Sequence, residues 1–305
     1  MPYYLAVDSG GSKTNIICFD KSGFSETVSI KGLGISFESD DELPELSSAV
    51  SPLAQKYDIR SAAVNLGGKN KRQFYNCLKS CLGDTPVSVF RESEGDAALA
   101  FGESVGASIV LMAGTGTITA GRAPDGKRII GGGWGMNIGD GGSGYDIGLS
   151  AVRAALIALD KSDALTPLQR ELTGLSSPIS AVQDAAEICR MRDDVRSRLF
   201  PIERKRIAAY SKTVAQHCER GEADALAIMA DAGKKMAELV ADGLSKLPGA
   251  KPAVGVAGGL VACAKYWQDA FENTFKARFP DASFIYERDG LIRGVKLLAE
   301  KQTGE

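Results

Sequence analysis

The amino-acid sequence predicts an α/β protein made of two related halves. Between residues 58 and 105, short apolar stretches alternate with amphipathic ones, which is typical of βαβ units with parallel strands. Two stretches, LAVDSGGSKTNIICFD from Leu5 and VLMAGTGTITAGRAPDG from Val110, each consist of an apolar strand, a Gly/Ser/Thr turn and a returning strand. Asp8 and Ala113, the last residues before these turns, are 105 positions apart. We therefore expect each half to open with a β-hairpin.

The elements of the first half follow from local composition. Runs rich in aromatic and β-branched residues favour strands, and apolar residues at three- and four-residue spacing favour helices. Clusters of glycine and serine between these runs favour turns. We expect strands at 3–8, 14–20, 26–30, 61–66 and 86–90, and helices at about 40–57, 71–82 and 96–103.

The second half is expected to carry a long helical segment. The stretch DALAIMADAGKKMAELVADGL has apolar residues at helical spacing, and the chain is predicted to be mainly helical from about 143 to 245. Asp289 can act as the N-cap of a last helix. We expect strands at 107–113, 118–123, 252–257 and 283–287, and further helices at 264–279 and 290–301.

Composition narrows the class of protein. Of the 305 residues, 44% are hydrophobic and 24% charged, which is ordinary for a soluble globular protein. A net charge of −2 argues against a broad surface for nucleic acid or anionic membranes. The six cysteines form no CxxC pair, so we expect neither a zinc site nor a redox motif. No apolar run approaches the ~20 residues of a membrane span. We expect a cytoplasmic protein, with the basic stretch 190–206 forming solvated helix faces rather than an anion-binding patch.

Three glycine turns, each after an apolar strand, are candidate phosphate sites. They lie in DSGGSKT, AGTGT and AGGL. Glycine allows backbone N–H groups to converge on an anion, and hydroxyl side chains add donors. A single turn of this kind is more often an ordinary hairpin, but three at strand ends favour a ligand site. The candidate phosphate ligands are Gly10, Gly11, Ser12, Lys13 and Thr14 in the first turn, and Gly114, Thr115, Gly116 and Thr117 in the second.

Other nucleotide signatures fit poorly. A P-loop needs G-x-x-x-x-G-K-[ST], and no Gly-Lys pair here precedes Ser or Thr. Gly139, Gly141 and Gly144 do match G-x-G-x-x-G, and Asp160 follows at about the Rossmann spacing. That acidic residue should end a second strand, whereas Asp160 is expected to end a helix. We therefore do not expect a dinucleotide site.

Two carboxylates are candidate site residues. Asp8 ends a strand beside the first turn, where a carboxylate can hold Mg²⁺ through water; a turn-forming aspartate is the alternative. Asp96 lies at the start of an expected helix, where it can act as a general base. Its alternative role is a capping box with Ser93.

Four stretches together resemble one family. AVDSGGSKT, AGTGT, GGGWGMNIGDGGSGYDIG and GVAGGL resemble the BadF/BadG/BcrA/BcrD-type ATPases, and among them the N-acetylglucosamine kinases. The most specific element is the Gly-Gly-Trp-Gly … Gly-Asp-x-Gly-Ser-x-Tyr pattern at 132–145. The resemblance implies a two-domain actin-like ATPase fold (ribonuclease H-like), with ATP bound in the interdomain cleft. It implies an N-terminal domain at 1–105 and a C-terminal domain at 106–305, with a helical insertion at about 143–245 and the last helix packing on the N-terminal domain.

The resemblance also implies roles for individual residues, with ATP and Mg²⁺ as cofactors and a homodimer as the assembly. The first and second turns would hold the ATP phosphates, Asp8 would lie near Mg²⁺, and Asp96 would be the catalytic base. Gly258 and Gly259 would contact adenosine. The residues expected to line the sugar pocket are Gly133, Trp134, Gly135, Asp140 and Ser143. Trp134 could instead be a core residue that holds its loop.

The sequence departs from the family pattern on the sugar side. Gly141 stands where the family usually has Glu, Asp146 stands where it often has Trp, and no Asn occurs near position 35. We expect phosphoryl transfer from ATP to a hydroxyl of an amino sugar, such as N-acetylglucosamine, glucosamine or a related sugar. The alternatives are an ATPase that activates a radical dehydratase or reductase, which the same family contains, and an ATP-binding protein with an altered sugar site.

Overall fold

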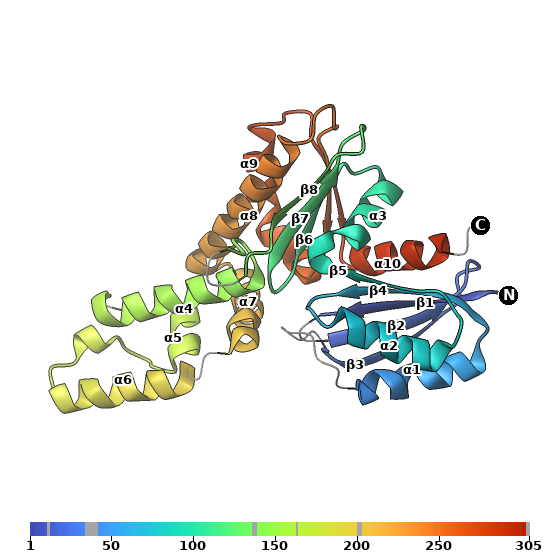
Figure 1. The fold of residues 1–305 in the computed structure, drawn as a ribbon. Coiled ribbons are helices and arrows are strands. Elements are labelled where there is room, and N and C mark those ends of the chain that lie inside the picture. The colour runs from blue at the N-terminus through green and yellow to red at the C-terminus, as the bar shows by residue number, and fades with distance from the viewer. Residues whose placement is uncertain (11–12, 34–41, 136–138, 163, 200–202, 303–305) are drawn as a thin grey trace.

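Two five-stranded mixed sheets, with helices packed against both, form the protein (Figure 1). The computed structural model describes residues 1–10, 13–33, 42–135, 139–162, 164–199 and 203–302. This architecture confirms the α/β class predicted from the sequence.

The first sheet contains the five strands expected in the first half. They are β1 (Tyr3–Ser9), β2 (Lys13–Phe19), β3 (Ser25–Lys31), β4 (Ile59–Leu66) and β5 (Val87–Arg91). Their order is β3-β2-β1-β4-β5. β1 and β2 form an antiparallel hairpin continued by β3, while β4 and β5 run parallel to β1. The carboxyl ends of β1, β4 and β5 therefore lie along one edge.

The second sheet repeats this topology. It contains β6 (Ile109–Ala113), β7 (Thr117–Arg122), β8 (Arg128–Gly132), β9 (Ala253–Ala257) and β10 (Ser283–Glu287), in the order β10-β9-β6-β7-β8. β6, β7 and β8 are antiparallel neighbours, and β9 and β10 run parallel to β6. The equivalence confirms two related halves that each open with a hairpin. β8 was not predicted, because its residues run into a glycine-rich stretch and it lies at the sheet edge.

Each sheet is covered on both faces. Helices α1 (Pro44–Lys56) and α2 (Lys71–Leu82) pack on one face of the first sheet, and α10 (Gly290–Lys301) packs on the other, against β1 and β4. Helix α3 (Asp96–Val105) lies on the second sheet and contacts α10 (Figure 1). Coverage from both sides leaves β1 and β4 buried along nearly their whole length.

In its described part, the segment expected to be mainly helical contains five helices. They are α4 (Gly144–Lys161), α5 (Pro167–Thr173), α6 (Ala185–Leu199), α7 (Arg204–Glu219) and α8 (Ala223–Leu244), with a short 3₁₀ helix, η2 (Ile179–Ala181), before α6. Helix α8 packs on the face of the second sheet opposite α3, whereas α4, α5 and α6 extend away from both sheets (Figure 1). None of the described helices is both long and apolar enough to cross a membrane.

The helix expected at 264–279 is shorter than predicted. It forms α9 (Gln268–Lys276), preceded by a 3₁₀ segment, η3 (Gly259–Tyr266). The indole of the fully buried Trp267 donates a hydrogen bond to the carbonyl of Leu260, 3.1 Å away. This bond holds the chain in a tight turn, so the α-helix begins only after the tryptophan.

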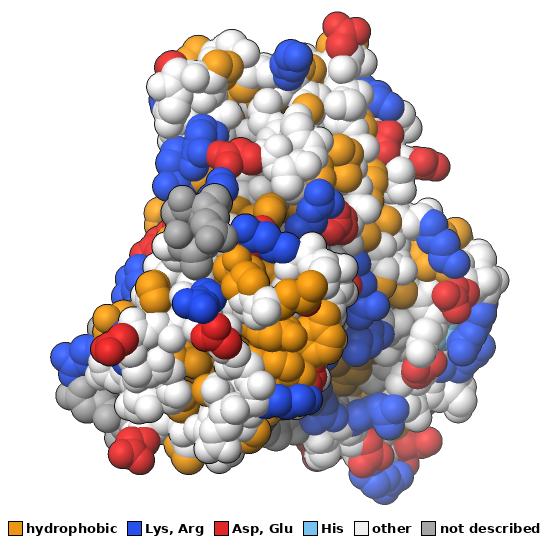
Figure 2. All heavy atoms as spheres, turned by 90° about the vertical axis from the view of Figure 1, so that its right-hand side faces the viewer, with side chains coloured by type: hydrophobic (Ala, Val, Ile, Leu, Met, Phe, Trp, Pro, Cys, Tyr) orange, Lys and Arg blue, Asp and Glu red, His pale blue; other side chains and the backbone are white. Residues whose placement is uncertain are grey.

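On the face turned to the viewer in Figure 2, the side chains are unevenly distributed by type. Hydrophobic side chains gather there in one patch, and acidic and basic side chains are interspersed around it. At the start of β1, the rings of Tyr3, Phe24 and Tyr57 contact one another, and Phe24 is 39% exposed. This end of β1 is opposite to the end that carries the first glycine turn.

Candidate active site

The first glycine turn closes the hairpin between β1 and β2. The amide of Gly10 donates to the carbonyl of Lys13 over 3.0 Å. The hydroxyls of Ser9 and Thr14 are buried and hydrogen-bonded at 2.8 Å, and Thr14 also accepts from the amide of Leu33. The Thr14 hydroxyl therefore holds the turn from inside, while Lys13 is exposed. The other two predicted residues of this turn, Gly11 and Ser12, lie outside the described residues.

Asp8 lies on β1 just before this turn, beside two polar residues. The side-chain amide of Asn65, on the neighbouring strand β4, donates to Asp8 Oδ1 over 2.9 Å. Burial raises the pKa of Asp8 above its usual value; the Asn65 hydrogen bond opposes this shift and the negative charge of Asp289 adds to it. Asp289 precedes α10 as its N-cap but makes no side-chain capping bond, so its predicted capping role is not seen.

A further carboxylate, Glu92, lies close to the first turn. A β-carbon placed on Gly67 would be 3.1 Å from Glu92 Oε2 and 3.5 Å from the α-carbon of Gly10. Glu92 begins η1 (Glu92–Glu94), the 3₁₀ segment that follows β5. Glu92 was missed by the sequence analysis, although its position directly after an expected parallel strand could have indicated it, because the carboxyl ends of neighbouring parallel strands meet at one edge.

The second glycine turn closes the hairpin between β6 and β7, and Asp140 lies beneath it. Within the turn, the amide of Gly114 donates to the carbonyl of Gly116 over 3.0 Å. The amide of Thr117 donates to Asp140 Oδ1 at 3.4 Å, and a β-carbon on Gly116 would be 3.0 Å from Asp140 Oδ2. Asp140 is 4% exposed and has a φ of 60°, a conformation that costs a non-glycine residue free energy. Its carboxylate therefore supports the turn from the protein side.

The start of α4 is also bonded to the second turn. The amide of Gly144 donates to the carbonyl of Gly114 at 2.8 Å, and that of Tyr145 donates to Thr115 at 3.3 Å. Ser143 is the N-cap of α4, because its hydroxyl accepts from the amide of Asp146. The predicted contacts of Asp140 and Ser143 with a sugar stay predictions, since both side chains are engaged within the protein here.

One aromatic residue of the glycine-rich stretch (131–148) is exposed. Trp134 is 75% exposed, so the alternative of a core tryptophan is wrong. Gly133 and Gly135 on either side have φ values of 70° and 91°, which glycine adopts at little cost. The amide of Gly133 donates to the carbonyl of Thr117, which places this segment beside the second turn.

The third turn lies against the second. Gly258 has a φ of 110°, and a β-carbon there would be 2.5 Å from the carbonyl oxygen of Ala113. Only glycine therefore allows this close approach between the ends of β9 and β6. Gly259 follows as the first residue of η3. The predicted adenosine turn and the second phosphate turn are thus neighbours.

Asp96 is the first residue of α3 and pairs with Arg128. The guanidinium Nη2 of Arg128, on β8, lies 2.9 Å from Asp96 Oδ1 and donates to the carbonyl of Glu94 at 3.1 Å. The Ser93–Asp96 capping box is not formed; instead the Glu94 carboxylate accepts from the amide of Arg91.

Asp96 lies some distance from the second turn. Arg128 begins β8, whereas Gly132 at the other end of β8 pairs with Ile118 beside the turn. Four residues of strand span about 13 Å. Gly95 packs against Ala120 and Ile130 in the middle of the β7–β8 hairpin. Asp96 therefore packs beside the same sheet that carries the second turn, but at the opposite end of β8, away from the turn.

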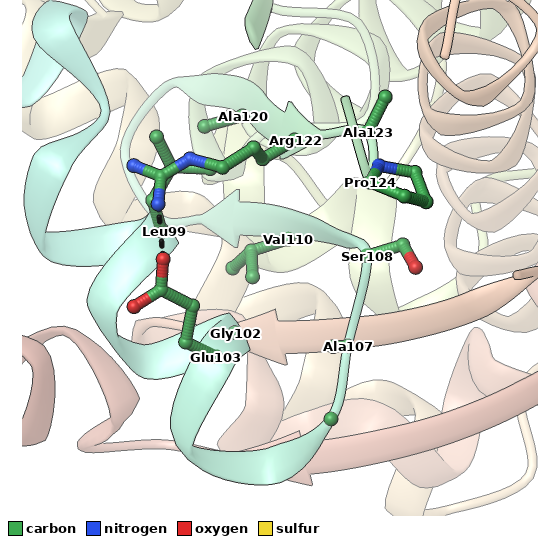
Figure 3. A pocket seen from close by; sticks show the side chains of 11 residues that line it. Leu99, Gly102, Glu103, Ala107, Ser108, Val110, Ala120, Arg122, Ala123 and Pro124 are labelled. Atoms are coloured by element: carbon green, nitrogen blue, oxygen red, sulfur yellow. Dashed lines mark hydrogen bonds and ion pairs between the residues drawn. The ribbon is translucent and has the colours of Figure 1, made fainter. Parts of the chain in front are cut away.

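Neither of two surface cavities contains a predicted site residue. One, of about 210 Å³, lies between the end of α3 and the β6–β7 hairpin, beside the ion pair of Glu103 and Arg122 (Figure 3). The other, of about 250 Å³, lies between α4 and α6. Among the described residues, no group of three His, Cys, Asp or Glu side chains is arranged to bind a metal.

The profile of the BadF/BadG/BcrA/BcrD ATPase family matches residues 5–295. The chain belongs to this family. A relative in Clostridium acetobutylicum, named N-acetylmuramic acid/N-acetylglucosamine kinase, is 24% identical over 318 residues, covering 99% of each chain. The family assignment confirms the resemblance inferred from the four glycine-rich stretches.

Solved structures confirm the fold of this BadF-type ATPase. A Chromobacterium violaceum protein assigned to the N-acetylglucosamine kinases superposes with a TM-score of 0.67 at 20% identity, covering 97% of this chain and 98% of the other. A ROK family glucokinase from Streptomyces griseus, in complex with glucose and AMPPNP, has a TM-score of 0.60 at 15% identity, covering 98% and 99%. The chain has the two-domain, actin-like fold of these proteins.

Proposed function

We propose that this BadF-type ATPase is an ATP-dependent carbohydrate kinase that phosphorylates a hydroxyl of an amino sugar, N-acetylglucosamine or a close relative. One observation carries the proposal: glycine turns end the equivalent strands β1 and β6 of two sheets with the same topology. Two such turns can hold one polyphosphate from two sides through backbone N–H groups. The name of the Clostridium relative, which matches over 99% of each chain, supports phosphoryl transfer to an amino sugar.

Both turns would bind the phosphates mainly through backbone N–H groups, with a few side chains adding contacts. Thr14 and Thr117 use their hydroxyls inside the protein, so their turns would offer mainly N–H groups. Thr115 is exposed at the tip of the second turn and would donate its hydroxyl. Lys13, exposed at the first turn, would add positive charge. Gly258 and Gly259 would approach the adenosine, since their turn adjoins the second one.

Asp8 fits the proposed site for Mg²⁺. Its carboxylate is desolvated and close to the charge of Asp289, an arrangement that a divalent cation would stabilise. Mg²⁺ prefers oxygen ligands and binds few carboxylates directly, so contact through water is expected. When bound, the ion supplies positive charge against the phosphate oxygens. Asn65 would orient the carboxylate through its hydrogen bond.

Asp96 would act as the general base. The acceptor hydroxyl would attack the γ-phosphorus, forming an O–P bond while the bond to the ADP oxygen breaks, and Asp96 would take the hydroxyl proton. Arg128 holds Asp96 in one orientation through its 2.9 Å contact. Asp96 and the second turn lie at opposite ends of β8, so the sugar and the γ-phosphate would occupy the space between them. The exposed Trp134 would then cover a face of the sugar, with Gly133, Gly135, Asp140 and Ser143 around it.

The proposal is tested by coupled ADP release with N-acetylglucosamine, glucosamine, N-acetylmuramic acid and glucose. We expect sugar-dependent release with at least one amino sugar. Asp96→Asn should lower kcat by about 10²–10⁴-fold while ATP affinity changes little. Asp125→Asn, an exposed turn aspartate that bonds only a neighbouring amide among the described contacts, is the matched control. Wild-type turnover by Asp96→Asn would exclude this base, and absence of release with every sugar would exclude the kinase.

A further inference from the structure

Lys235 on α8 occupies a position between two carboxylates and the glycine-rich stretch. Its ammonium lies 3.0 Å from Asp146 Oδ2 and 2.9 Å from Asp231 Oδ2. Its aliphatic stem lies over Gly141, where an added β-carbon would be 3.6 Å from the β-carbon of Lys235. The side chain is 38% exposed. Lys235 thus bridges α8 and the first turn of α4, at the point where the glycine-rich stretch enters that helix.

Asp146 links Lys235 to the backbone of the glycine-rich stretch through hydrogen bonds. The oxygen that accepts from Lys235, Oδ2, also accepts from the amide of Gly142 at 2.9 Å. Gly142 also packs closely against α8, because a β-carbon on this residue would lie 2.6 Å from Met236 Cγ. One carboxylate oxygen therefore joins the ammonium of α8 to the peptide just before the N-cap of α4.

The same short segment holds the second turn. The hydroxyl of Thr117 donates to the carbonyl of Gly141 at 3.1 Å, and the amide of Thr117 donates to the carboxylate of Asp140. Thr117 is completely buried. A continuous series of hydrogen bonds therefore runs from Lys235 through Asp146 and residues 140–142 to the turn.

The charge on Lys235 is maintained by its partners. Desolvation lowers its pKa, but the hydrogen bonds and charges of Asp231 and Asp146 outweigh that effect and raise the pKa above the usual value. The ammonium is therefore present throughout the neutral range.

We propose that Lys235 is a positioning residue for the second glycine turn: through Asp146 it fixes residues 140–142, and these fix Gly116 and Thr117. Lys235 would act on the turn rather than on the nucleotide itself. The consequence for catalysis depends on the proposed function, which assigns the phosphate contacts to this turn. Loss of the ammonium would let the turn sample more orientations, so nucleotide would bind more weakly while the chemical step proceeds with the same groups.

Lys235→Met tests this role because it keeps the stem over Gly141 and removes the charge. We expect the KM for ATP to rise about three- to ten-fold with kcat nearly unchanged, the range for a partly exposed, charge-assisted contact. Lys235→Arg, which keeps the positive charge, should have a KM for ATP close to that of the wild type. Lys234→Met, at the adjacent and exposed position of the same helix, is the matched control and should behave as wild type. Asp146→Asn, which keeps the size of the side chain, should reproduce the effect of Lys235→Met.

Hydrogen exchange on the nucleotide-free protein gives a readout independent of activity. Lys235→Met should speed exchange of the amides of Thr117 and Gly142, whereas Lys234→Met should not. Unchanged exchange and unchanged KM in Lys235→Met would overturn the proposal, as would an equal change in Lys234→Met. Faster exchange in a protein that binds no ATP would support the link between Lys235 and the turn and exclude the kinase function.

Discussion

Replacing Gly142 by alanine is expected to destabilise the protein at the point where the glycine-rich stretch packs on α8. Gly142 has a φ of 77°, in the left-handed region. An added β-carbon would lie 2.6 Å from Met236 Cγ and still closer to the carbonyl oxygen of Ala232. The methionine side chain can move, but the backbone oxygen belongs to a 22-residue helix and cannot move without shifting α8.

Two costs add for Gly142→Ala. The left-handed conformation costs an alanine about 1–2 kcal/mol. Forcing an extra methyl group into a well-packed site costs about 1–3 kcal/mol more. The free energy of unfolding should therefore fall by about 2–5 kcal/mol. Because residues 140–142 hold the second turn, ATP affinity should fall as well.

Equilibrium unfolding in urea measures this loss, and Gly141→Ala is the neighbouring control. A β-carbon on Gly141 would lie 3.6 Å from the nearest atom, the β-carbon of Lys235, which is ordinary contact. We expect Gly141→Ala to stay within about 1 kcal/mol of wild type. If the free energies of unfolding of the two variants agree within about 1 kcal/mol, the inferred packing of Gly142 on α8 is incorrect.

Three further predictions follow from buried and exposed side chains. Thr14→Val should lower the free energy of unfolding by about 1–3 kcal/mol, since the buried Ser9 hydroxyl loses its partner; urea unfolding measures this, and an unchanged midpoint would contradict it. Thr115→Val should leave the urea midpoint unchanged but raise the KM for ATP, and an unchanged KM would remove Thr115 from the phosphate site. Iodoacetamide at pH 8 should modify the exposed Cys189 well before Cys218, because burial raises the pKa of Cys218 to about 11 and keeps its thiol protonated. Peptide mass spectrometry measures the order of modification, and the reverse order would contradict the structure.

Much of the fold was predictable because its signals are local. The hairpin turns after Asp8 and Ala113 are visible as glycine runs after apolar strands, and Ser143 has the chemistry of an N-cap. β8 escaped prediction because an edge strand that ends in glycines lacks a strong strand pattern. The length of α9 depends on the burial of Trp267, which is set by tertiary packing.

The surroundings of the site were less predictable because they join distant parts of the chain. Asn65 bonds to Asp8 from β4, and the charge of Asp289 acts on Asp8 from the start of α10; no local pattern marks either residue as a partner of Asp8. Gly141 and Asp146 appeared only as departures from a family pattern. In the structure both lie against Lys235 of α8, a residue that the sequence placed on an ordinary amphipathic helix.

The central claim is that the two equivalent glycine turns hold the phosphates of ATP. Hydrogen exchange with and without ATP and Mg²⁺ tests it most directly. Protection on nucleotide binding should concentrate in peptides covering the turns after β1 and β6, and should extend to residues 140–145, which are bonded to the second turn. Protection confined to other elements, with both turns exchanging as fast as in the free protein, would contradict the account.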